Sequence, residues 1–271
     1  LNQGRAVHYP CRAEAGFQPD PEAIARLVTP RTRAIVVINP NNPTGAVYSE
    51  ETLRAIVRLA EKHRLIIFSD EIYDQMTYDD ARFIPLAPLV NDTLCATFSG
   101  LSKVYRACGY RVGWVSLSGS TEQAGDYLHA LDLLASLRLC SNVPAQWAVQ
   151  TALGGFQSVQ DLVRPGGRLY ESRRVIIDSV AASPYLDVTP PAGAMYAFVG
   201  VDRAHFPDLD DQAFALDLLE KKHVLVAPGT SFNIRDNRFF RITNLPGADM
   251  LKEVFGRIQE LLDSYVVERT A

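Results

Sequence analysis

The sequence predicts an α/β fold in which helices flank a mainly parallel sheet, followed by a smaller α+β domain. Two continuous apolar runs, Ala34–Ile38 and Leu65–Phe68, are typical of strands buried on both faces. Between them the apolar residues recur with the period of a helix. Residues 50–62 are therefore expected to form an amphipathic helix whose buried face carries Leu53, Ile56, Val57 and Ala60. A strand, a helix and a second buried strand form the βαβ unit of a parallel sheet.

The other elements of the first part are predicted by the same patterns. Ser49 is a suitable N-cap for the 50–62 helix, and the apolar run Thr93–Phe98 predicts a third buried strand. A strand of undetermined direction is expected over 111–117, and residues 5–9 resemble a short strand. Helices are expected at 21–27, 122–139, 145–153 and 168–182, the second with a stripe made of Leu128, Leu131, Leu134, Ala135 and Leu139.

The composition changes near Arg164-Pro-Gly-Gly167, after which short strands and turns become frequent. We therefore expect residues 1–165 to belong to a larger domain and residues 166–271 to form a small one. The elements expected in the small domain are strands at 194–199, 224–227 and 239–243 and helices at 211–221 and 247–265.

Charge and composition exclude several classes of protein. The net charge of −4 comes from interspersed signs, with neither a basic stripe for nucleic acid nor a polybasic patch for membranes. No apolar run approaches the length of a membrane span, and no signal peptide is expected. The cysteines, Cys11, Cys95, Cys108 and Cys140, are scattered without ligand spacing. They are expected to be buried thiols in a cytoplasmic protein, and no metal site is expected.

One stretch, residues 98–114, organises the predicted chemistry. The Thr93–Phe98 strand leads into Ser99-Gly-Leu-Ser102, and Lys103 follows directly. A lysine at the end of a central strand can be desolvated, which favours the neutral amine that attacks a carbonyl to form a Schiff base. Arg111 offers a planar charged fork suited to a phosphate, which the Ser99 and Ser102 hydroxyls would supplement. Taken alone, Lys103 is more typical of a solvated surface lysine.

Further polar residues follow the other predicted strands, and together they suit pyridoxal 5′-phosphate (PLP). Ligands of open α/β sheets lie outside the carboxyl ends of the strands. Asp70 would keep the pyridine nitrogen of PLP protonated, Asn42 and Tyr73 would contact its phenolic oxygen, and Lys103 would condense with its aldehyde. Arg111 would hold the phosphate.

Each residue also has an ordinary structural interpretation. Asn42-Pro-Thr-Gly45 is a turn signal, and Tyr73 alone is more often a packing residue. The acidic strand end at Asp70-Glu71 would suit a metal-binding nucleotidase, although no G-x-x-x-x-G-K-[ST] accompanies it. The ordered occurrence of all these residues at predicted strand ends favours PLP over the separate explanations.

Several stretches of the chain resemble a known family. Asn39–Gly45, Ser69–Tyr73 and Ser99–Trp114 resemble the corresponding stretches of class I aminotransferases, which are PLP-dependent enzymes of fold type I. The detail is similar to the bacterial alanine (glutamate–pyruvate) aminotransferases, and this likeness rests on Gly100–Arg106, Leu139–Gln146, Thr151–Gly155 and Pro165–Tyr170.

The resemblance implies a set of roles. Lys103 would be the catalytic Schiff-base lysine, and the cofactor would be bound by Asn42, Asp70, Tyr73, Ser99, Ser102, Lys103 and Arg111. Many relatives carry a phosphate-binding hydroxyl where this chain has Gly100, which leaves Ser99 as the neighbouring hydroxyl. Arg241, with Asn42 nearby, would bind the α-carboxylate of the substrate. Without the resemblance, Arg241 would be interpreted as a surface charge.

The implied activity is transfer of an amino group between an L-amino acid, alanine above all, and a 2-oxo acid such as pyruvate or 2-oxoglutarate. The implied assembly is a homodimer, because Ser141–Pro144 resembles a loop that reaches the other subunit; Pro144 as a simple helix break is the alternative. Other PLP chemistry, such as that of a C–S lyase, would use the same Lys103 and Asp70. A PLP-binding effector domain of a transcription regulator is a further alternative.

The chain starts at Leu1 in what resembles mid-domain sequence. The family's N-terminal portion contributes to the cofactor site, so residues 1–271 alone are expected to bind PLP weakly or not at all.

Overall fold

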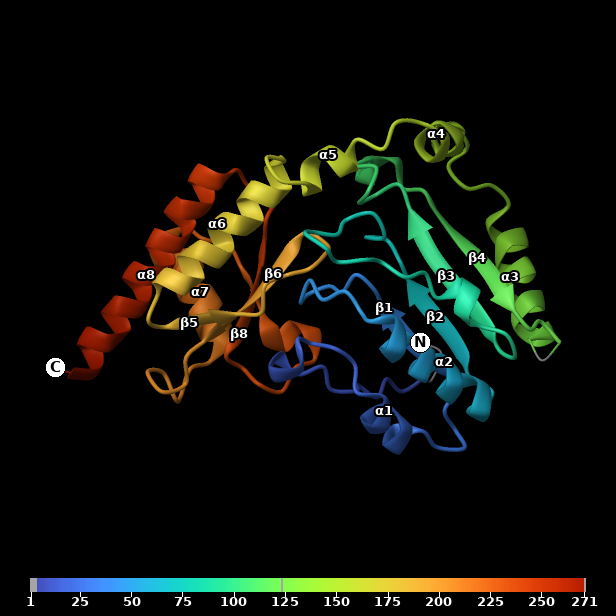
Figure 1. The fold of residues 1–271 in the computed structure, drawn as a ribbon, viewed down its shortest axis with the longest axis horizontal. Helices are drawn as coiled ribbons and strands as arrows, with labels where there is room; N and C mark the ends of the chain where they lie inside the picture. The colour runs from blue at the N-terminus through green and yellow to red at the C-terminus, as the bar shows by residue number, and fades with distance from the viewer. Residues whose placement is uncertain (1–3, 123, 271) are drawn as a thin grey trace. The chain divides into compact units, whose positions relative to one another are not determined.

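The computed structural model describes residues 4–122 and 124–270, which form two compact units (Figure 1). The first unit holds residues up to 40 together with 47–77 and 82–160. The second holds 41–46, 78–81 and the rest of the chain from 161. The change of unit at Gln160 lies inside a short helix, α5 (Val159–Val163). The domain division at residue 165 stays a prediction about the whole protein.

The first unit contains a four-stranded sheet of order β1-β2-β3-β4. The strands are β1 (Ala34–Ile38), β2 (Ile66–Asp70), β3 (Leu94–Gly100) and β4 (Gly113–Gly119). The pairings β1–β2 and β2–β3 are parallel, whereas β4 is antiparallel to β3. The expected mainly parallel sheet is therefore confirmed, and the undetermined direction of the fourth strand is settled as antiparallel.

Helix α2 (Glu50–His63) connects β1 to β2 as predicted. Ser49 caps it by accepting a hydrogen bond from the backbone N–H of Thr52. Its predicted apolar face is buried, and the strand residues Ile35, Val37 and Ile67 are buried as well. This amphipathic helix, which packs against β2, covers one face of the sheet because its apolar residues recur at the helical period.

The opposite face of this sheet is half exposed, which corrects the expectation that the strands are buried on both faces. Val36 is 53% exposed and Phe98 is 39% exposed. Register places Val36 beside Phe68 and Asp70 beside Phe98, so Asp70 shares this face. On this face the ring of Tyr127, from α3 (Gly125–Arg138), lies 6.0 Å from that of Phe68. Asp70 therefore ends its strand on a face that is open to a ligand.

The helices that complete the first unit are α1 (Pro21–Leu27), α3 (Gly125–Arg138) and α4 (Val143–Gly154), with 3-10 turns at Ala13–Ala15, Ala87–Leu89 and Cys108–Tyr110. One expectation is wrong here. Residues 5–9 form no strand, and Tyr9 instead donates its hydroxyl hydrogen to the carbonyl of Val36. The stripe on α3 is not buried, since Leu134 is 63% exposed and Leu139, directly after the helix, is 85% exposed.

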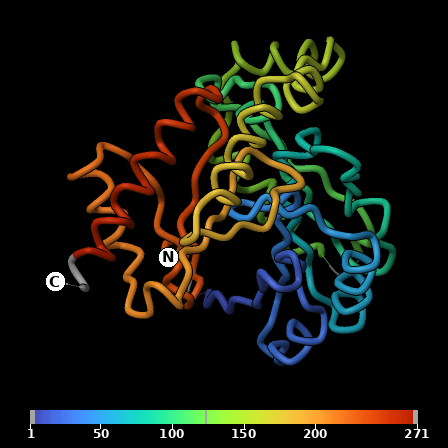
Figure 2. Tube along the Cα trace, turned by 60° about the vertical axis from the view of Figure 1, so that its left-hand side comes forward, coloured from blue at the N-terminus to red at the C-terminus, as the bar shows by residue number. Residues whose placement is uncertain are grey.

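The second unit packs a four-stranded antiparallel sheet against helices. Its sheet order is β5-β6-β8-β7, and its elements are α6 (Arg168–Ala182), β5 (Leu186–Val188), β6 (Tyr196–Val201), α7 (Asp211–Lys222), β7 (Ala227–Pro228), the 3-10 turn Gly229–Phe232, β8 (Phe239–Thr243) and α8 (Ala248–Thr270). Helix α6 lies beside α8 (Figure 2). One sheet face joins these helices in a core that includes Val199, Phe240 and Leu251.

The prediction for this unit was largely correct and failed at short strands. Strand β5 was not predicted, and the expected 224–227 strand is reduced to Ala227–Pro228. No helix in the described residues is both long and apolar enough to cross a membrane.

Candidate active site

Asp70 and Lys103 are electrostatic neighbours in the first unit. Asp70 is the last residue of β2 and accepts a hydrogen bond from the backbone N–H of Ile72 at 3.2 Å. Burial raises the pKa of the Asp70 carboxyl, while the Ile72 hydrogen bond and the charge of Lys103 oppose the rise. The predicted acid and the predicted amine thus lie in one electrostatic environment.

Lys103 lies in the turn that follows β3, and this turn is part of a loop with closed ends. The backbone N–H of Leu101 donates to the carbonyl of Val112 at 3.0 Å. Ser102 directly follows one member of this pair and Arg111 directly precedes the other, so the closed loop places the backbones of these two residues at the same end. A Cβ on Gly100 would meet the Val112 carbonyl at 2.8 Å, so this close approach favours glycine at that position. Glycine at 100 therefore reflects packing of the loop.

Arg111 is exposed and adopts a left-handed backbone conformation with φ of 54°. Its Nη1 donates to the carbonyl of Cys108 at 2.6 Å. No carboxylate in the described residues forms an ion pair with it. A guanidinium anchored by a neutral carbonyl keeps its charge for an incoming anion such as a phosphate.

The remaining predicted residues of this unit differ in exposure. Tyr73 is almost fully buried, at 3% exposure, in the turn after β2. Ser99 is half-buried on β3, where it pairs with Trp114 of β4. By alternation along β3, Ser99 and Asp70 fall on opposite faces of the sheet, since Asp70 pairs with Phe98. This placement weakens the assignment of Ser99 as a phosphate ligand relative to Ser102.

Asn42 and Arg241 meet in the second unit. Arg241 on β8 donates from Nη1 to Oδ1 of Asn42 at 2.8 Å, across 199 positions of the chain. The guanidinium carbon of Arg241 also lies 4.4 Å from the ring centre of Tyr196 and 4.7 Å from that of Phe232. Sequence reasoning paired Arg241 with Asn42 only through the family resemblance, and it missed both rings.

Gly45 fixes the loop that carries Asn42. Its φ is +72°, and a Cβ there would meet the Cβ of Pro191 at 2.3 Å. Its carbonyl accepts hydrogen bonds from the backbone N–H groups of Ala192 and Gly193 at 2.9 and 2.8 Å. The turn that the sequence predicted at this position therefore packs closely against the segment that leads into β6.

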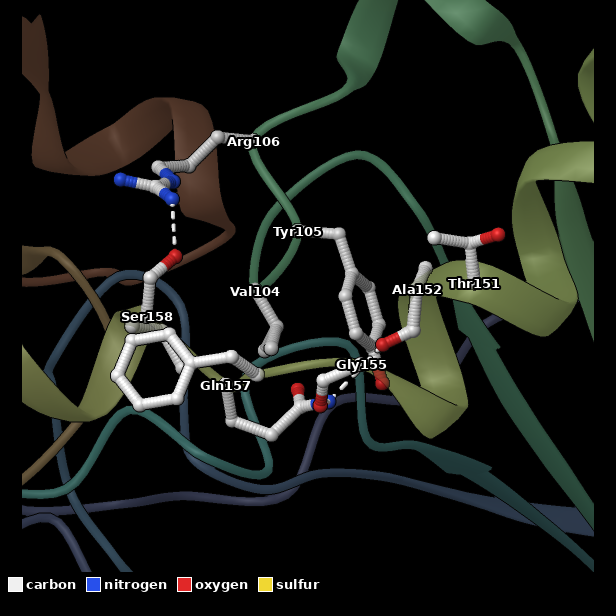
Figure 3. A pocket seen from close by; sticks show the side chains of 10 residues that line it. Val104, Tyr105, Arg106, Thr151, Ala152, Gly155, Gln157 and Ser158 are labelled. Carbon is white, nitrogen blue, oxygen red and sulfur yellow. Dashed lines mark hydrogen bonds between the residues drawn. The ribbon is translucent and has the colours of Figure 1, made fainter.

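A separate cavity of about 240 Å³ lies beside the residues that follow Lys103 (Figure 3). Its walls include Val104, Tyr105 and Arg106, and the Arg106 guanidinium donates to the Ser158 hydroxyl. Lys103 is not among its lining residues, so this cavity does not mark the site of the amine.

The cysteines differ from expectation as well. Cys95 is buried, but Cys108 and Cys140 are exposed. Both exposed cysteines lie in segments whose neighbouring side chains are exposed too. The sequence pattern did not reveal this exposure.

The comparisons with known proteins identify the family. The model of the family "Aminotransferase class I and II" matches residues 1–258. The chain belongs to the class I and II aminotransferases. It is 48% identical over 265 residues to the glutamate-pyruvate aminotransferase AlaA of Escherichia coli K12, and 47% identical over 265 residues to the alanine aminotransferase of Mycobacterium tuberculosis H37Rv. Each match covers 98% of this chain.

Solved aminotransferase structures share the fold. A crystal structure of an aminotransferase from Escherichia coli matches with a TM-score of 0.93 and 48% identity, over 96% of this chain and 64% of that one. The alanine aminotransferase from Pyrococcus furiosus matches with a TM-score of 0.90 and 36% identity, over 96% of this chain and 65% of that one. The predicted fold type I is confirmed. The aminotransferase chain spans 65% of the Escherichia coli relative and 62% of the mycobacterial one.

The side chains present fit PLP, the cofactor of this family. The residues comprise Asp70 on a half-exposed sheet face, Lys103, whose charge acts on that carboxylate, and Ser102 and Arg111 at one end of a closed loop. These groups match a protonated ring nitrogen, an aldehyde and a phosphate respectively.

Proposed function

We propose that the full protein is an alanine aminotransferase that exchanges the amino group between L-alanine and a 2-oxo acid, with pyruvate and 2-oxoglutarate as its oxo acids. The observation that carries this proposal is the 48% identity to a named glutamate-pyruvate aminotransferase along 98% of the chain. Amino acids and 2-oxo acids share an α-carboxylate, for which a planar guanidinium is the suitable partner.

The cofactor in this proposal is PLP, bound through Lys103. When bound, PLP supplies an aldehyde and a protonated ring that accepts electrons from the α-carbon of the substrate. Asp70 carries the negative charge that keeps the ring nitrogen protonated, and Tyr73 and Asn42 hold the phenolic oxygen. Ser102 and Arg111 bind the phosphate, with Ser99 as the neighbouring hydroxyl.

Lys103 also moves the proton in this proposal. Its Nζ, once displaced by the substrate amine, takes the proton from the α-carbon as a general base. Arg241 and Asn42 orient the substrate by its carboxylate, which restricts which bond to the α-carbon is presented. Because the amino acid and the oxo acid react in turn at the same residues, we expect ping-pong kinetics.

A homodimer is the proposed assembly. Apolar side chains stand exposed on and next to α3 and α4, and they include Leu137, which is 74% exposed, and Trp147, which is 75% exposed. Exposed apolar groups of this size mark surfaces that pack against another protein. Light scattering on the full-length protein tests this assembly, and a monomeric mass would contradict it.

The activity is tested on full-length protein loaded with PLP. We expect pyruvate to form from L-alanine only when 2-oxoglutarate is present, and a Lys103→Ala control to be inactive. Consumption of aspartate or an aromatic amino acid but not alanine would contradict the substrate while leaving the cofactor assignment in place. Release of sulfide from cysteine substrates would instead indicate a C–S lyase. If no turnover occurs and a helix-turn-helix precedes this chain, the regulator alternative is favoured.

A further inference from the structure

One face of the sheet in the second unit carries a row of aromatic rings and arginines, which we call the aromatic row. Side chains alternate along strands, so Tyr196 and Phe198 of β6 share a face, as do Phe239 and Arg241 of β8. Register places Phe198 opposite Arg241. The intervening residues of these strands point to the opposite face and belong to the hydrophobic core with the helices. Phe232, from the 3-10 turn Gly229–Phe232, completes the row.

The rings of the row contact one another in sequence. Phe198 stacks on Phe239 with ring centres 4.9 Å apart and planes 8° apart. Phe198 also meets Phe232 edge to face, with ring centres 6.1 Å apart. Because Phe198 is 1% exposed, these contacts tie the position of the Phe232 ring to the buried part of the row.

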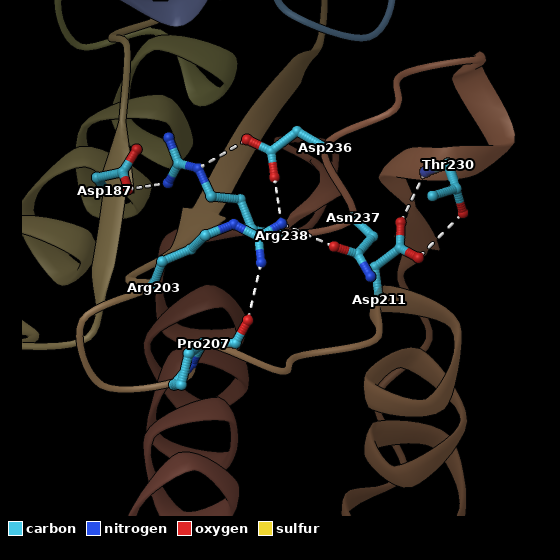
Figure 4. Close-up of polar contacts among 8 residues, drawn as sticks. All are labelled: Asp187, Arg203, Pro207, Asp211, Thr230, Asp236, Asn237 and Arg238. Atoms are coloured by element: carbon cyan, nitrogen blue, oxygen red, sulfur yellow. Dashed lines mark hydrogen bonds and ion pairs between the residues drawn. The ribbon is translucent and has the colours of Figure 1, made fainter.

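An arginine lies at each end of the row. The two differ in whether an acidic side chain neutralises their charge. Arg238 lies over the Phe239 ring at 4.2 Å and forms ion pairs with Asp187 and Asp236 (Figure 4). Gly200 provides the space for it, since a Cβ there would overlap the Arg238 guanidinium. The positive charge of Arg238 is therefore neutralised within the unit.

Two aromatic rings lie against the Arg241 guanidinium, and no acidic side chain of the described residues pairs with it. Tyr196 lies 4.4 Å and Phe232 lies 4.7 Å from its guanidinium carbon. Its hydrogen-bond partner is the neutral amide oxygen of Asn42, and no carboxylate in the described residues forms an ion pair with it. Stacked rings contact the faces of a guanidinium and use none of its five N–H donors, so a carboxylate has donors left to bind.

We propose that Tyr196 and Phe232 are positioning residues that hold the Arg241 guanidinium in orientation for the carboxylate of the substrate. The inference rests on the proposed function and deepens it, because it adds two residues to the recognition of the carboxylate shared by amino and oxo acids. The rings restrict rotation of the arginine before a ligand arrives, so less freedom is lost on binding.

The predicted signature is kinetic. Both substrates carry the same carboxylate, so removal of one ring raises KM for L-alanine and for 2-oxoglutarate by the same factor, about 3- to 30-fold for a cation–π contact of ordinary strength. The turnover number kcat stays nearly constant, because binding of the carboxylate is common to the ground state and the transition state.

The test uses the PLP-loaded full-length protein. Phe232→Leu is the main variant, since Phe232 is half-buried and leucine keeps the site apolar. Phe232→Tyr and Tyr196→Phe keep an aromatic ring against Arg241 and are expected to raise KM less than Phe232→Leu does. Phe206→Leu is the matched control, because it removes a buried ring of the same unit whose ring contacts, with Tyr185 and Tyr265 among others, lie outside the row. It should leave both KM values unchanged.

A second readout does not depend on turnover. Propionate carries a carboxylate but no amine, and its dissociation constant is measured by calorimetry on each variant. We expect Phe232→Leu to weaken propionate binding by the factor seen in KM, and Phe206→Leu to leave it unchanged. If the wild type binds propionate but does not transaminate alanine, the proposed function fails and the propionate series still tests the rings. If Phe232→Leu leaves propionate binding unchanged, or Phe206→Leu weakens it equally, the positioning role is overturned.

Discussion

Arg241 donates from Nη1 to Oδ1 of Asn42 at 2.8 Å, although the loop of Asn42 comes early in the chain and Arg241 comes near its end. The contact exists because the Asn42 loop belongs to the second unit. Gly45 holds the loop there through two hydrogen bonds to its carbonyl and a backbone conformation that favours glycine. The geometry of the Arg241 site thus depends on the backbone conformation of Gly45.

Substitution of Gly45 by alanine tests this dependence. The left-handed φ of +72° and the overlap with Pro191 both oppose a Cβ. We expect the free energy of unfolding to fall by at least about 2 kcal/mol, with a raised KM for the amino acid because Asn42 shifts. Thermal unfolding and steady-state kinetics measure the two effects. Gly247→Ala, where a Cβ meets nothing within 4 Å, is the control. Equal stability of the two variants would contradict the role of Gly45.

Asn42→Asp tests whether Arg241 binds an anion. The substitution keeps the shape of the side chain but places a carboxylate where the amide oxygen now accepts from Arg241. An internal ion pair would compete with the substrate carboxylate, so we expect KM to rise about 10-fold or more for both substrates. Asn42→Ala, which adds no charge, should raise KM less. A smaller effect of the aspartate than of the alanine would count against anion binding at Arg241.

Asp70→Asn tests the proposed role of the carboxylate. The amide fits the same space but carries no charge to keep the cofactor ring protonated. We expect kcat to fall about 10²- to 10³-fold, while the protein retains a near-native melting temperature because Asp70 is only partly buried. Asp70→Glu should keep more activity than the asparagine variant. Full activity of Asp70→Asn would show that this carboxylate does not serve the cofactor.

Glu71 predicts a dependence of stability on pH. It is 7% exposed, and it accepts hydrogen bonds from the Ser69 hydroxyl and the Leu86 N–H. Burial raises the pKa of Glu71 above 4.5, the hydrogen bonds from Leu86 and Ser69 oppose the rise, and the neighbouring acids Asp74 and Asp70 add to it. A carboxyl with a raised pKa binds its proton more tightly in the folded state. Folding stability is therefore lost as the pH rises from about 4.5 through the folded-state pKa.

Glu71→Gln removes this titration while its amide oxygen can still accept both hydrogen bonds. We expect its melting temperature to match that of the wild type at pH 4 and to exceed it at pH 7.5. Glu51→Gln, on the exposed side of α2, controls for the loss of one negative charge. A wild type that gains stability over Glu71→Gln as the pH rises would contradict the raised pKa.

The elements that depend on local patterns were predictable from the sequence. Helix α2 and its Ser49 cap were predicted because the helical period and the capping chemistry lie within one segment. Residues 5–9 were wrongly expected to form a strand because a strand needs a partner, and a segment this short does not indicate whether one exists. Similarly, the α3 stripe has the spacing of a buried helix face, but the described residues do not cover it.

The site was predictable in its residue types and only partly in its contacts. Asp70 and Lys103 were expected to be neighbours because the ends of adjacent parallel strands meet at one edge of a sheet. The rings on Arg241 were not predicted, since Phe232 lies in a short 3-10 turn without a distinctive pattern. The sequence did indicate that Tyr196 shares a strand face with Phe198, because the two residues lie two positions apart on β6.

The central claim is that Lys103 is the residue that binds the cofactor covalently. Full-length protein incubated with PLP, reduced with borohydride and digested for peptide mass spectrometry tests it most directly. We expect the pyridoxyl modification on the peptide that contains Lys103, in near-stoichiometric amount, and its loss in Lys103→Ala. Stoichiometric modification of another lysine, such as the exposed Lys62 or Lys252, with Lys103 unmodified, would contradict the account.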